Sequence, residues 1–328
     1  MDDQFKPRLP FKSPHVQTIL GSSRFRAWGA NPLLKTSEPV IIDAGAGVRL
    51  LGYYTKQPHR KESSGLVVLL HGWEGSSESS YILSMSKFLY RRGFDVFRLN
   101  LRDHGESHHL NEGLFHGALI DETTNAVQAI GQLSNHKPLF LMGFSLGGNF
   151  YLRIALRQRT APIANLRHVI AVSPALDPYK ATLCIDNGNP VYRSYFMSKW
   201  KKSLRKKQAL FPHCYDFRPL MHHKTCMGLT EAMMGYYPDF PDYRTYFNHY
   251  TLLGNTFSDL AVPVTVITSK DDPVVPVSDF YELQHNDNLK LVIHNHGGHC
   301  GFLESFPSRC WHEEKACRIF EQYSIPVM

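Results

Sequence analysis

A single serine stands in a glycine-flanked motif that could carry nucleophilic chemistry. The motif Gly143-Phe144-Ser145-Leu146-Gly147 follows an apolar run that starts at Pro138, and a helical pattern continues over Asn149 to Arg157. This order predicts a strand, a sharp turn and a helix, with Ser145 at the apex. A Cβ at either flanking glycine would crowd such a turn. The turn would expose the Ser145 hydroxyl at a helix N-terminus, where the helix dipole favours negative charge. We therefore expect Ser145 to be a nucleophile.

A serine hydroxyl needs a base that removes its proton, and a histidine is the usual base. The best candidate is His299, in the run His296-Gly297-Gly298-His299-Cys300-Gly301, which directly follows a predicted strand ending near His294. Glycines on both sides of His299 allow the tight loop that would bring its imidazole to the serine. His294 and His296 are the competing candidates.

An acid should orient the imidazole, and two adjacent aspartates follow the predicted strand Val264 to Thr268. Successive side chains point in different directions, so only one of Asp271 and Asp272 can reach the histidine. We favour Asp272, because the proline after it fixes the local backbone, and we interpret Asp271 as a turn-forming residue.

The tetrahedral intermediate of acyl transfer also needs hydrogen-bond donors for its oxyanion. The run His71-Gly72-Trp73-Glu74-Gly75 follows an early predicted strand. We expect the backbone N–H groups of Trp73 and Leu146 to be the two donors. We interpret Asn100 to Ser107 as a rim loop that packs beneath the site.

Alternating strand and helix patterns position these residues. They predict an α/β fold with a mostly parallel central sheet of about eight strands and helices on both faces. The predicted strands are 40–44, 50–54, 66–70, 95–99, 138–144, 168–172, 264–268 and 290–294, and the predicted helices are 79–92, 119–133, 149–157 and 313–323.

One segment interrupts this alternation. Residues 179–262 separate two core strands and are rich in aromatic residues, far longer than a strand–helix connection requires. We expect a single domain over residues 1–328, with 179–262 inserted as a helical cap over the site. A few cap aromatics should line an apolar pocket; the candidates are Tyr236, Tyr237, Phe240, Tyr243, Tyr246 and Phe247.

Composition is typical of a globular protein, with 43% hydrophobic and 20% charged residues. Residues 1–6 contain no apolar core, so we expect no signal peptide, a cytoplasmic location and reduced thiols on all six cysteines. His213-Cys214 and the group His222, His223 and Cys226 lack the paired spacing of a zinc site. We therefore expect no metal and no cofactor.

Part of the net charge of +7 lies in one basic run, Lys199 to Lys207. We favour a solvated helix face with Trp200 and Leu204 on its buried side over a face that meets anionic lipid. Contact with a membrane and the oligomeric state stay open. No nucleic-acid-binding motif accompanies the charge, so nucleic acid is not an expected partner.

Together these motifs resemble the YheT-like branch of the α/β-hydrolases, which is related to the ABHD-type lipases and esterases. The matching segments are Ser13 to Thr18, His71 to Gly75, Gly143 to Asn149, Asp271 to Pro273 and Gly297 to Glu304. The chain order serine, aspartate, histidine is also that of the α/β-hydrolase fold. The resemblance implies a carboxylic ester hydrolase (a serine esterase of the EC 3.1.1 type) with Ser145, Asp272 and His299 as its triad.

Other functions are compatible with the same residues. An alcohol acyltransferase or a thioesterase would use the same triad and differ in the acceptor or in the pocket. A binding protein of another class would keep the fold without catalysis. We expect a small-molecule ester with an acyl chain as the substrate.

Overall fold

The computed structural model describes residues 4–27, 29, 31, 33–58, 63–306 and 309–324. Met1 to Asp3, which entered the argument about a signal peptide, lie outside the described residues. Within them, eight strands form one sheet in the order β1-β2-β4-β3-β5-β6-β7-β8. The strands are β1 (Glu38–Asp43), β2 (Arg49–Thr55), β3 (Leu66–Leu70), β4 (Asp95–Leu99), β5 (Leu139–Phe144), β6 (Leu166–Val172), β7 (Val264–Ser269) and β8 (Leu289–His294). The predicted fold class is confirmed.

The sheet is mixed at one edge only. Strand β1 pairs antiparallel with β2, and β2 pairs antiparallel with β4. Every pairing from β4 to β8 is parallel. The carboxyl ends of these parallel strands therefore meet at one end of the sheet, where loops from different strands can build a common site.

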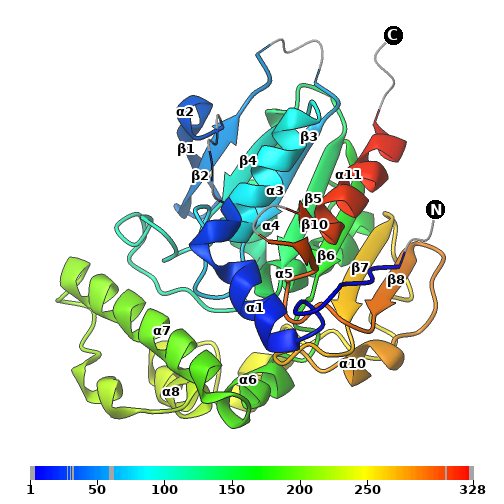
Figure 1. The fold of residues 1–328 in the computed structure, drawn as a ribbon. Coiled ribbons are helices and arrows are strands. Elements are labelled where there is room, and N and C mark those ends of the chain that lie inside the picture. The colour runs from blue at the N-terminus through cyan, green and yellow to red at the C-terminus, as the bar shows by residue number, and fades with distance from the viewer. Residues whose placement is uncertain are drawn as a thin grey trace.

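Helices cover both faces of the sheet, and the central strands are buried on both sides. Helices α3 (Ser80–Arg91) and α11 (Trp311–Tyr323) pack with one face, and α4 (Ile120–Gln132) and α5 (Leu146–Leu156) pack with the other (Figure 1). In β3, Leu66, Val68 and Leu70 join the core on the α4 and α5 side. Val67 and Leu69 join the core on the α3 and α11 side. This alternation explains why the strand is apolar at every position.

Most predicted elements are present with ends shifted by one or two residues, but one boundary needs correction and several elements were not predicted. The helix after the serine motif begins at Leu146 rather than Asn149, because Ser145 itself is the N-cap residue. The N-terminal region, for which no element was predicted, forms α1 (Pro14–Ser22), η1 (Arg24–Ala27) and α2 (Leu33–Thr36). A small second sheet pairs β9 (Leu303–Ser305) with β10 (Arg309–Cys310).

The long segment between β6 and β7 is helical over much of its length. Its elements are α6 (Pro178–Asn187), α7 (Pro190–Leu210), η4 (Arg218–His222), α8 (Cys226–Met233), η5 (Met234–Tyr236) and α9 (Tyr243–Asn248). Asn189 caps α7 through its side chain, and Pro190 occupies the first turn, where no N–H is needed. In Figure 1, α6, α7 and α8 gather below one end of the sheet. A short helix, α10 (Ser278–Tyr281), follows β7.

Candidate active site

Ser145 occupies the sharp turn between β5 and α5. Its backbone has φ 52° and ψ −119°, a strained conformation for a residue with a side chain. Its N–H donates to Val172 O at 2.9 Å, which fixes the turn against the end of β6. A Cβ on Gly143 would lie 2.3 Å from Gly147 O, and a Cβ on Gly147 would lie 2.4 Å from His71 O. Both positions therefore require glycine.

His299 and Asp272 form a buried hydrogen-bonded pair. Nδ1 of His299 donates to Asp272 Oδ2 at 2.9 Å and lies 3.1 Å from Oδ1. Asp272 Oδ1 also accepts the N–H groups of Val274 and Val275, at 2.8 and 2.9 Å. The Asp272 side chain is fully buried. This arrangement fixes the imidazole with Nδ1 protonated and leaves Nε2 as the basic nitrogen.

The competing residues make other contacts. Asp271 Oδ1 accepts the N–H of Gly298 at 2.9 Å, and its Oδ2 lies 3.4 Å from Nδ1 of His296. His294 accepts the N–H of Phe5 at Nδ1 and packs edge-on against Trp311. Asp271 thus shapes the loop that carries His299, whereas Asp272 contacts the imidazole itself.

The histidine loop is tied to the serine turn through the end of β6. Cys300 N–H donates to Ser173 Oγ at 3.2 Å, and Cys300 Sγ lies 3.6 Å from Val172 O. That carbonyl is the acceptor of the Ser145 N–H. No hydrogen bond joins Ser145 Oγ to His299 in the described part of the chain. In unliganded enzymes such contacts are commonly longer than in the substrate complex.

Helix α1 supports the same loop, a role that the sequence patterns did not indicate. Thr18 Oγ1 accepts the N–H of His299 at 2.9 Å. Gln17 receives the N–H of Leu303 at 2.7 Å and donates to Leu303 O at 3.1 Å. Gly298 has φ 54°, and a Cβ there would lie 2.5 Å from Pro14 O. The segment Ser13 to Thr18 therefore positions the histidine.

Two backbone amides beside Ser145 have no hydrogen-bond partner within the described part of the chain. In the loop of residues 72–77, which is described throughout, the N–H groups of all residues except Trp73 are hydrogen-bonded. The amide of Leu146, at the first position of α5, likewise has no partner among the described residues. A Cβ on Gly72 would lie 3.1 Å from Ser145 Cβ, so this loop passes directly against the serine. The arrangement suits the binding of an oxyanion.

A cavity of about 90 Å³ opens onto Ser145, and aromatic side chains form much of its wall. Of the six aromatic residues expected to line it, Tyr237, Tyr246 and Phe247 do so, whereas Tyr236, Phe240 and Tyr243 do not. The remaining aromatic lining residues are Trp73, Phe115, Phe196, Trp200 and Tyr250. The wall is therefore mostly apolar, with Ser145, His116, Thr182 and Thr230 among its polar side chains.

Comparison with known proteins agrees with this geometry. The model of a family described as the alpha/beta hydrolase family matches residues 67–310, which span β3, the serine turn, both aspartates and His299. The chain belongs to the alpha/beta hydrolase family.

Several relatives match over most of their length. YheT of Escherichia coli (strain K12), which carries an esterase name, is 23% identical over 92% of this chain and 87% of its own. The phospholipase ABHD3 of Bos taurus is 23% identical over 90% of this chain and 74% of its own. The predicted resemblance to YheT-like and ABHD-type proteins is confirmed.

Solved structures share the hydrolase fold at low sequence identity. The Pyrococcus furiosus esterase Pf2001 aligns with a TM-score of 0.56 and 16% identity, over 91% of this chain and 97% of that chain. A 2,6-dihydroxy-pseudo-oxynicotine hydrolase aligns with a TM-score of 0.60 and 19% identity, over 90% and 70% of the two chains.

Electrostatics in this hydrolase favour a charged imidazole. Burial lowers the pKa of His299, but the Asp272 carboxylate and Cys300 beside it outweigh burial and hold that pKa well above its ordinary value of 6.5. The position of the Asp272 carboxylate therefore favours the protonated form of the His299 ring.

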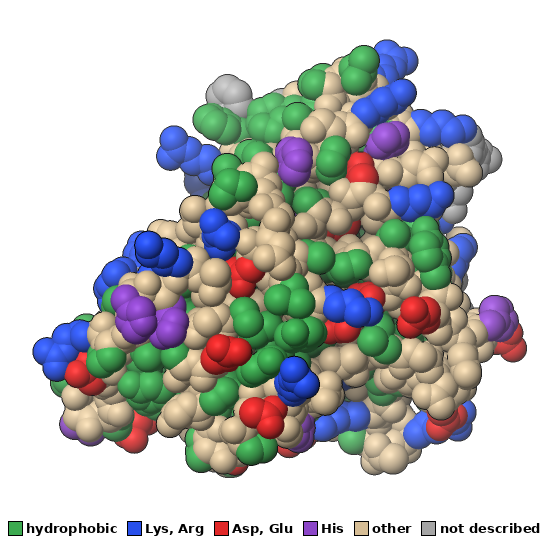
Figure 2. Space-filling model, turned by 90° about the horizontal axis from the view of Figure 1, so that it is seen from below, with side chains coloured by type: hydrophobic (Ala, Val, Ile, Leu, Met, Phe, Trp, Pro, Cys, Tyr) green, Lys and Arg blue, Asp and Glu red, His purple; other side chains and the backbone are tan. Residues whose placement is uncertain are grey.

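The basic run lies on α7 and is only partly a solvated face. Trp200 and Leu204 are buried, as expected, and Trp200 packs edge-on against Trp73 at a ring distance of 5.1 Å. Lys207, however, is 1% exposed and donates to Asp103 Oδ1 at 2.7 Å. Figure 2 shows Lys and Arg side chains spread over this face, on the side where α7 lies and elsewhere, with hydrophobic side chains in its middle. Within the described residues, no helix is long and apolar enough to cross a membrane.

Proposed function

We propose that this hydrolase cleaves carboxylic esters through an acyl-enzyme formed on Ser145. The observation that carries the proposal is the set of groups around one serine hydroxyl. A strained turn exposes Ser145, a buried Asp272–His299 pair joins the loops that follow β7 and β8, and the amides of Trp73 and Leu146 have no hydrogen-bond partner among the described residues. Each group matches one requirement of acyl transfer by a serine nucleophile.

The proposed reaction proceeds in two halves. Ser145 Oγ attacks the acyl carbon while Nε2 of His299 accepts its proton, and the Trp73 and Leu146 amides bind the oxyanion. His299 then protonates the leaving alcohol, which departs as the acyl-enzyme forms. Water attacks this intermediate with His299 as the base, and the acid is released as Ser145 regains its proton.

The apolar cavity supports an acyl group as the part of the substrate that binds there. Its wall combines aromatic and small apolar side chains, among them Ala175, Ala181 and Ile185. Relatives with esterase and phospholipase names make an ester the simplest substrate class. We propose that the helices of residues 178–248 serve as a cap that closes this cavity over the serine.

Hydrolysis of a p-nitrophenyl ester series, from acetate to palmitate, tests the proposal. Ser145→Ala should lower kcat/KM by at least about a thousandfold. Ser198→Ala, on the exposed face of α7, is the matched control and should retain the wild-type rate. The preferred chain length would give the size of the acyl site. Added ethanol would yield ethyl esters if the acyl-enzyme transfers to alcohols.

A different nucleophile, or a binding role, would give another pattern. Equal rates for wild type and Ser145→Ala would move the chemistry away from Ser145. Inactivity of both proteins across the series, together with no labelling of the wild type by a serine-directed phosphonate, would indicate a fold retained for binding.

A further inference from the structure

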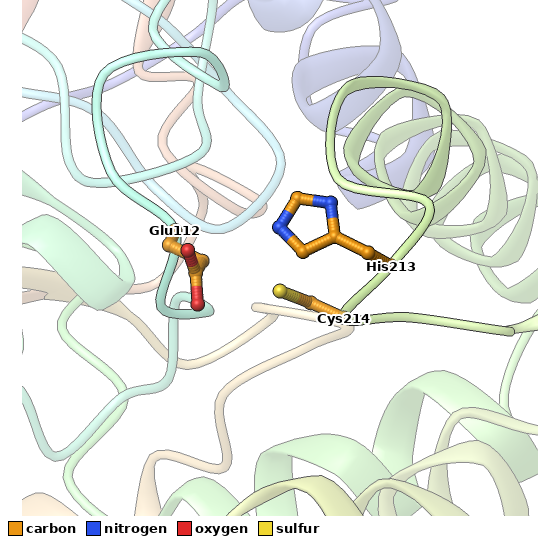
Figure 3. A group of neighbouring side chains, drawn as sticks. All are labelled: Glu112, His213 and Cys214. Atoms are coloured by element: carbon orange, nitrogen blue, oxygen red, sulfur yellow. The ribbon is translucent and has the colours of Figure 1, made fainter.

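Three potential metal ligands meet outside the cavity that holds Ser145. Glu112 lies in the loop between β4 and α4, and His213 and Cys214 lie in the turn after α7. One ligand atom from each residue lies within 4.8 Å of the other two. Figure 3 shows the imidazole and the thiol facing Glu112 across the gap between the two segments. Sequence spacing could not reveal the group, because its third member is remote in the chain.

The segment that carries His213 and Cys214 also fixes the backbone of Glu112. Lys207 Nζ donates to the carbonyls on either side of it, Asn111 O at 2.6 Å and Gly113 O at 3.0 Å. Tyr215 O–H donates to Glu112 O at 2.9 Å. The two halves of the group are therefore held together before any ligand binds, which lowers the entropic cost of binding.

The donor set is nitrogen, sulfur and oxygen. Zn²⁺ binds imidazole, thiolate and carboxylate, and its tetrahedral sites bring donor atoms to roughly 3–4 Å from one another. Glu112 and His213 are exposed and Cys214 is partly buried. Small side-chain rotations would therefore bring the three ligand atoms to the spacing of a zinc site. Three protein ligands leave one position for water.

We propose that Glu112, His213 and Cys214 bind one Zn²⁺ ion, with a water molecule as the fourth ligand. Helix α7 contributes Phe196 and Trp200 to the cavity wall, and the loop of Glu112 leads to Phe115 and Gly117 on the same wall. The ion would therefore link α7 to the loop of Glu112 on the outer side of the cavity wall. This inference does not depend on the proposed ester hydrolysis.

Metal titrations of the chelator-treated full-length protein test the proposal. Zn²⁺ competition with a chromophoric chelator should reveal one tight site, and Co²⁺ should produce a thiolate charge-transfer absorption. Cys214→Ser should remove that absorption, and both Cys214→Ser and His213→Ala should weaken Zn²⁺ binding by at least about tenfold. Cys184→Ser, at another partly exposed free cysteine, is the matched control and should bind like the wild type.

Two measurements keep a negative result interpretable. Unfolding midpoints measured without metal should agree between Cys214→Ser and the wild type, so that lost binding is not lost folding. One equivalent of Zn²⁺ should also protect Cys214 of the wild type from alkylation. The proposal is wrong if Cys214→Ser and His213→Ala bind Zn²⁺ as the wild type does, or if the wild type binds no ion tightly.

Discussion

At the scale of single residues, the candidate site depends on side chains from three strand ends. Ser145 follows β5, Asp272 follows β7 and His299 follows β8. Each is held by contacts of its own: a backbone hydrogen bond to β6 for the serine, two amides for the aspartate, and Thr18 for the histidine. Substitutions at these contacts should therefore show whether a contact orients a site residue or stabilises the fold.

Asp272→Asn should change both the rate and its pH dependence. His299 must be neutral to accept the serine proton, so kcat/KM should fall as pH drops through the pKa of His299. Because that pKa is raised, the fall in the wild type should lie above pH 6.5. Removing the carboxylate should move the fall to lower pH and reduce kcat/KM by about 10³–10⁴. The measurement is a pH profile of kcat/KM on a p-nitrophenyl ester.

Asp271→Asn is the matched control for this change. It alters the neighbouring carboxylate, which contacts Gly298 and His296 and not the His299 ring. A profile displaced as far by Asp271→Asn as by Asp272→Asn would contradict the assignment of Asp272.

Gly147→Ala should damage both the fold and the activity. The added Cβ would lie 2.4 Å from His71 O and 2.6 Å from Leu70 O, and both obstacles are backbone atoms that cannot rotate away. We expect a loss of at least about 1–3 kcal/mol in the free energy of unfolding. Urea denaturation and ester hydrolysis would measure the two effects.

Gly235→Ala offers the comparison, since a Cβ there would meet no atom of the described residues within 4 Å. Its stability should stay close to that of the wild type. Equal stabilities for the two variants would show that the turn relaxes more easily than its contacts indicate.

At the scale of elements, α7 is joined to the rim loop by a buried ion pair. Lys207 and Asp103 have side-chain exposures of 1% and 7%, with 2.7 Å between Nζ and Oδ1. Asp103 also accepts the N–H of Phe115, a residue of the cavity wall. The pair therefore links the inserted helices to the loops of the sheet.

Lys207→Met should lower the free energy of unfolding by about 3–5 kcal/mol, because it leaves the Asp103 carboxylate buried without its cation. Urea denaturation followed by circular dichroism would measure the loss. Lys202→Met, at an exposed position of the same helix, should change stability by no more than about 0.5 kcal/mol. Equal losses of unfolding free energy in the two variants would show that the Lys207–Asp103 ion pair does not stabilise the fold. Adding Asp103→Asn to Lys207→Met should recover part of the loss.

At the scale of the whole molecule, buried neutral histidines should make stability depend on pH. Burial lowers the pKa of His104 to about 4 and that of His168 to about 4. Between pH 6.5 and 4, these two histidines bind protons in the unfolded chain but stay neutral in the folded protein. The free energy of unfolding should therefore decrease as pH drops through this range, by up to about 1.4 kcal/mol per pH unit for each group.

His168→Gln isolates one of these groups. Glutamine can still hydrogen-bond to Thr265, the partner of His168 in the fold, but it does not titrate. Urea denaturation at several pH values should give a shallower slope for this variant than for the wild type. An unchanged slope would mean that His168 does not contribute to the acid sensitivity.

Local sequence patterns were enough to predict the sheet, the serine turn and the chain order of the three candidate site residues. Apolar runs such as Leu66 to Leu70 and the glycines around Ser145 constrain the backbone locally, so their structure follows from adjacent residues. Local patterns also favoured Asp272, because a proline follows it, and His299, because it lies between glycines after a predicted strand.

Contacts between groups that are distant in the chain became visible in the tertiary structure alone. In the fold, Thr18 contacts the histidine loop, and Lys207 of the basic run is buried against Asp103. Three of the six predicted aromatic residues line the cavity, and Glu112 lies beside His213 and Cys214. Such contacts depend on how helices pack on the sheet and on each other, and no local periodicity encodes them.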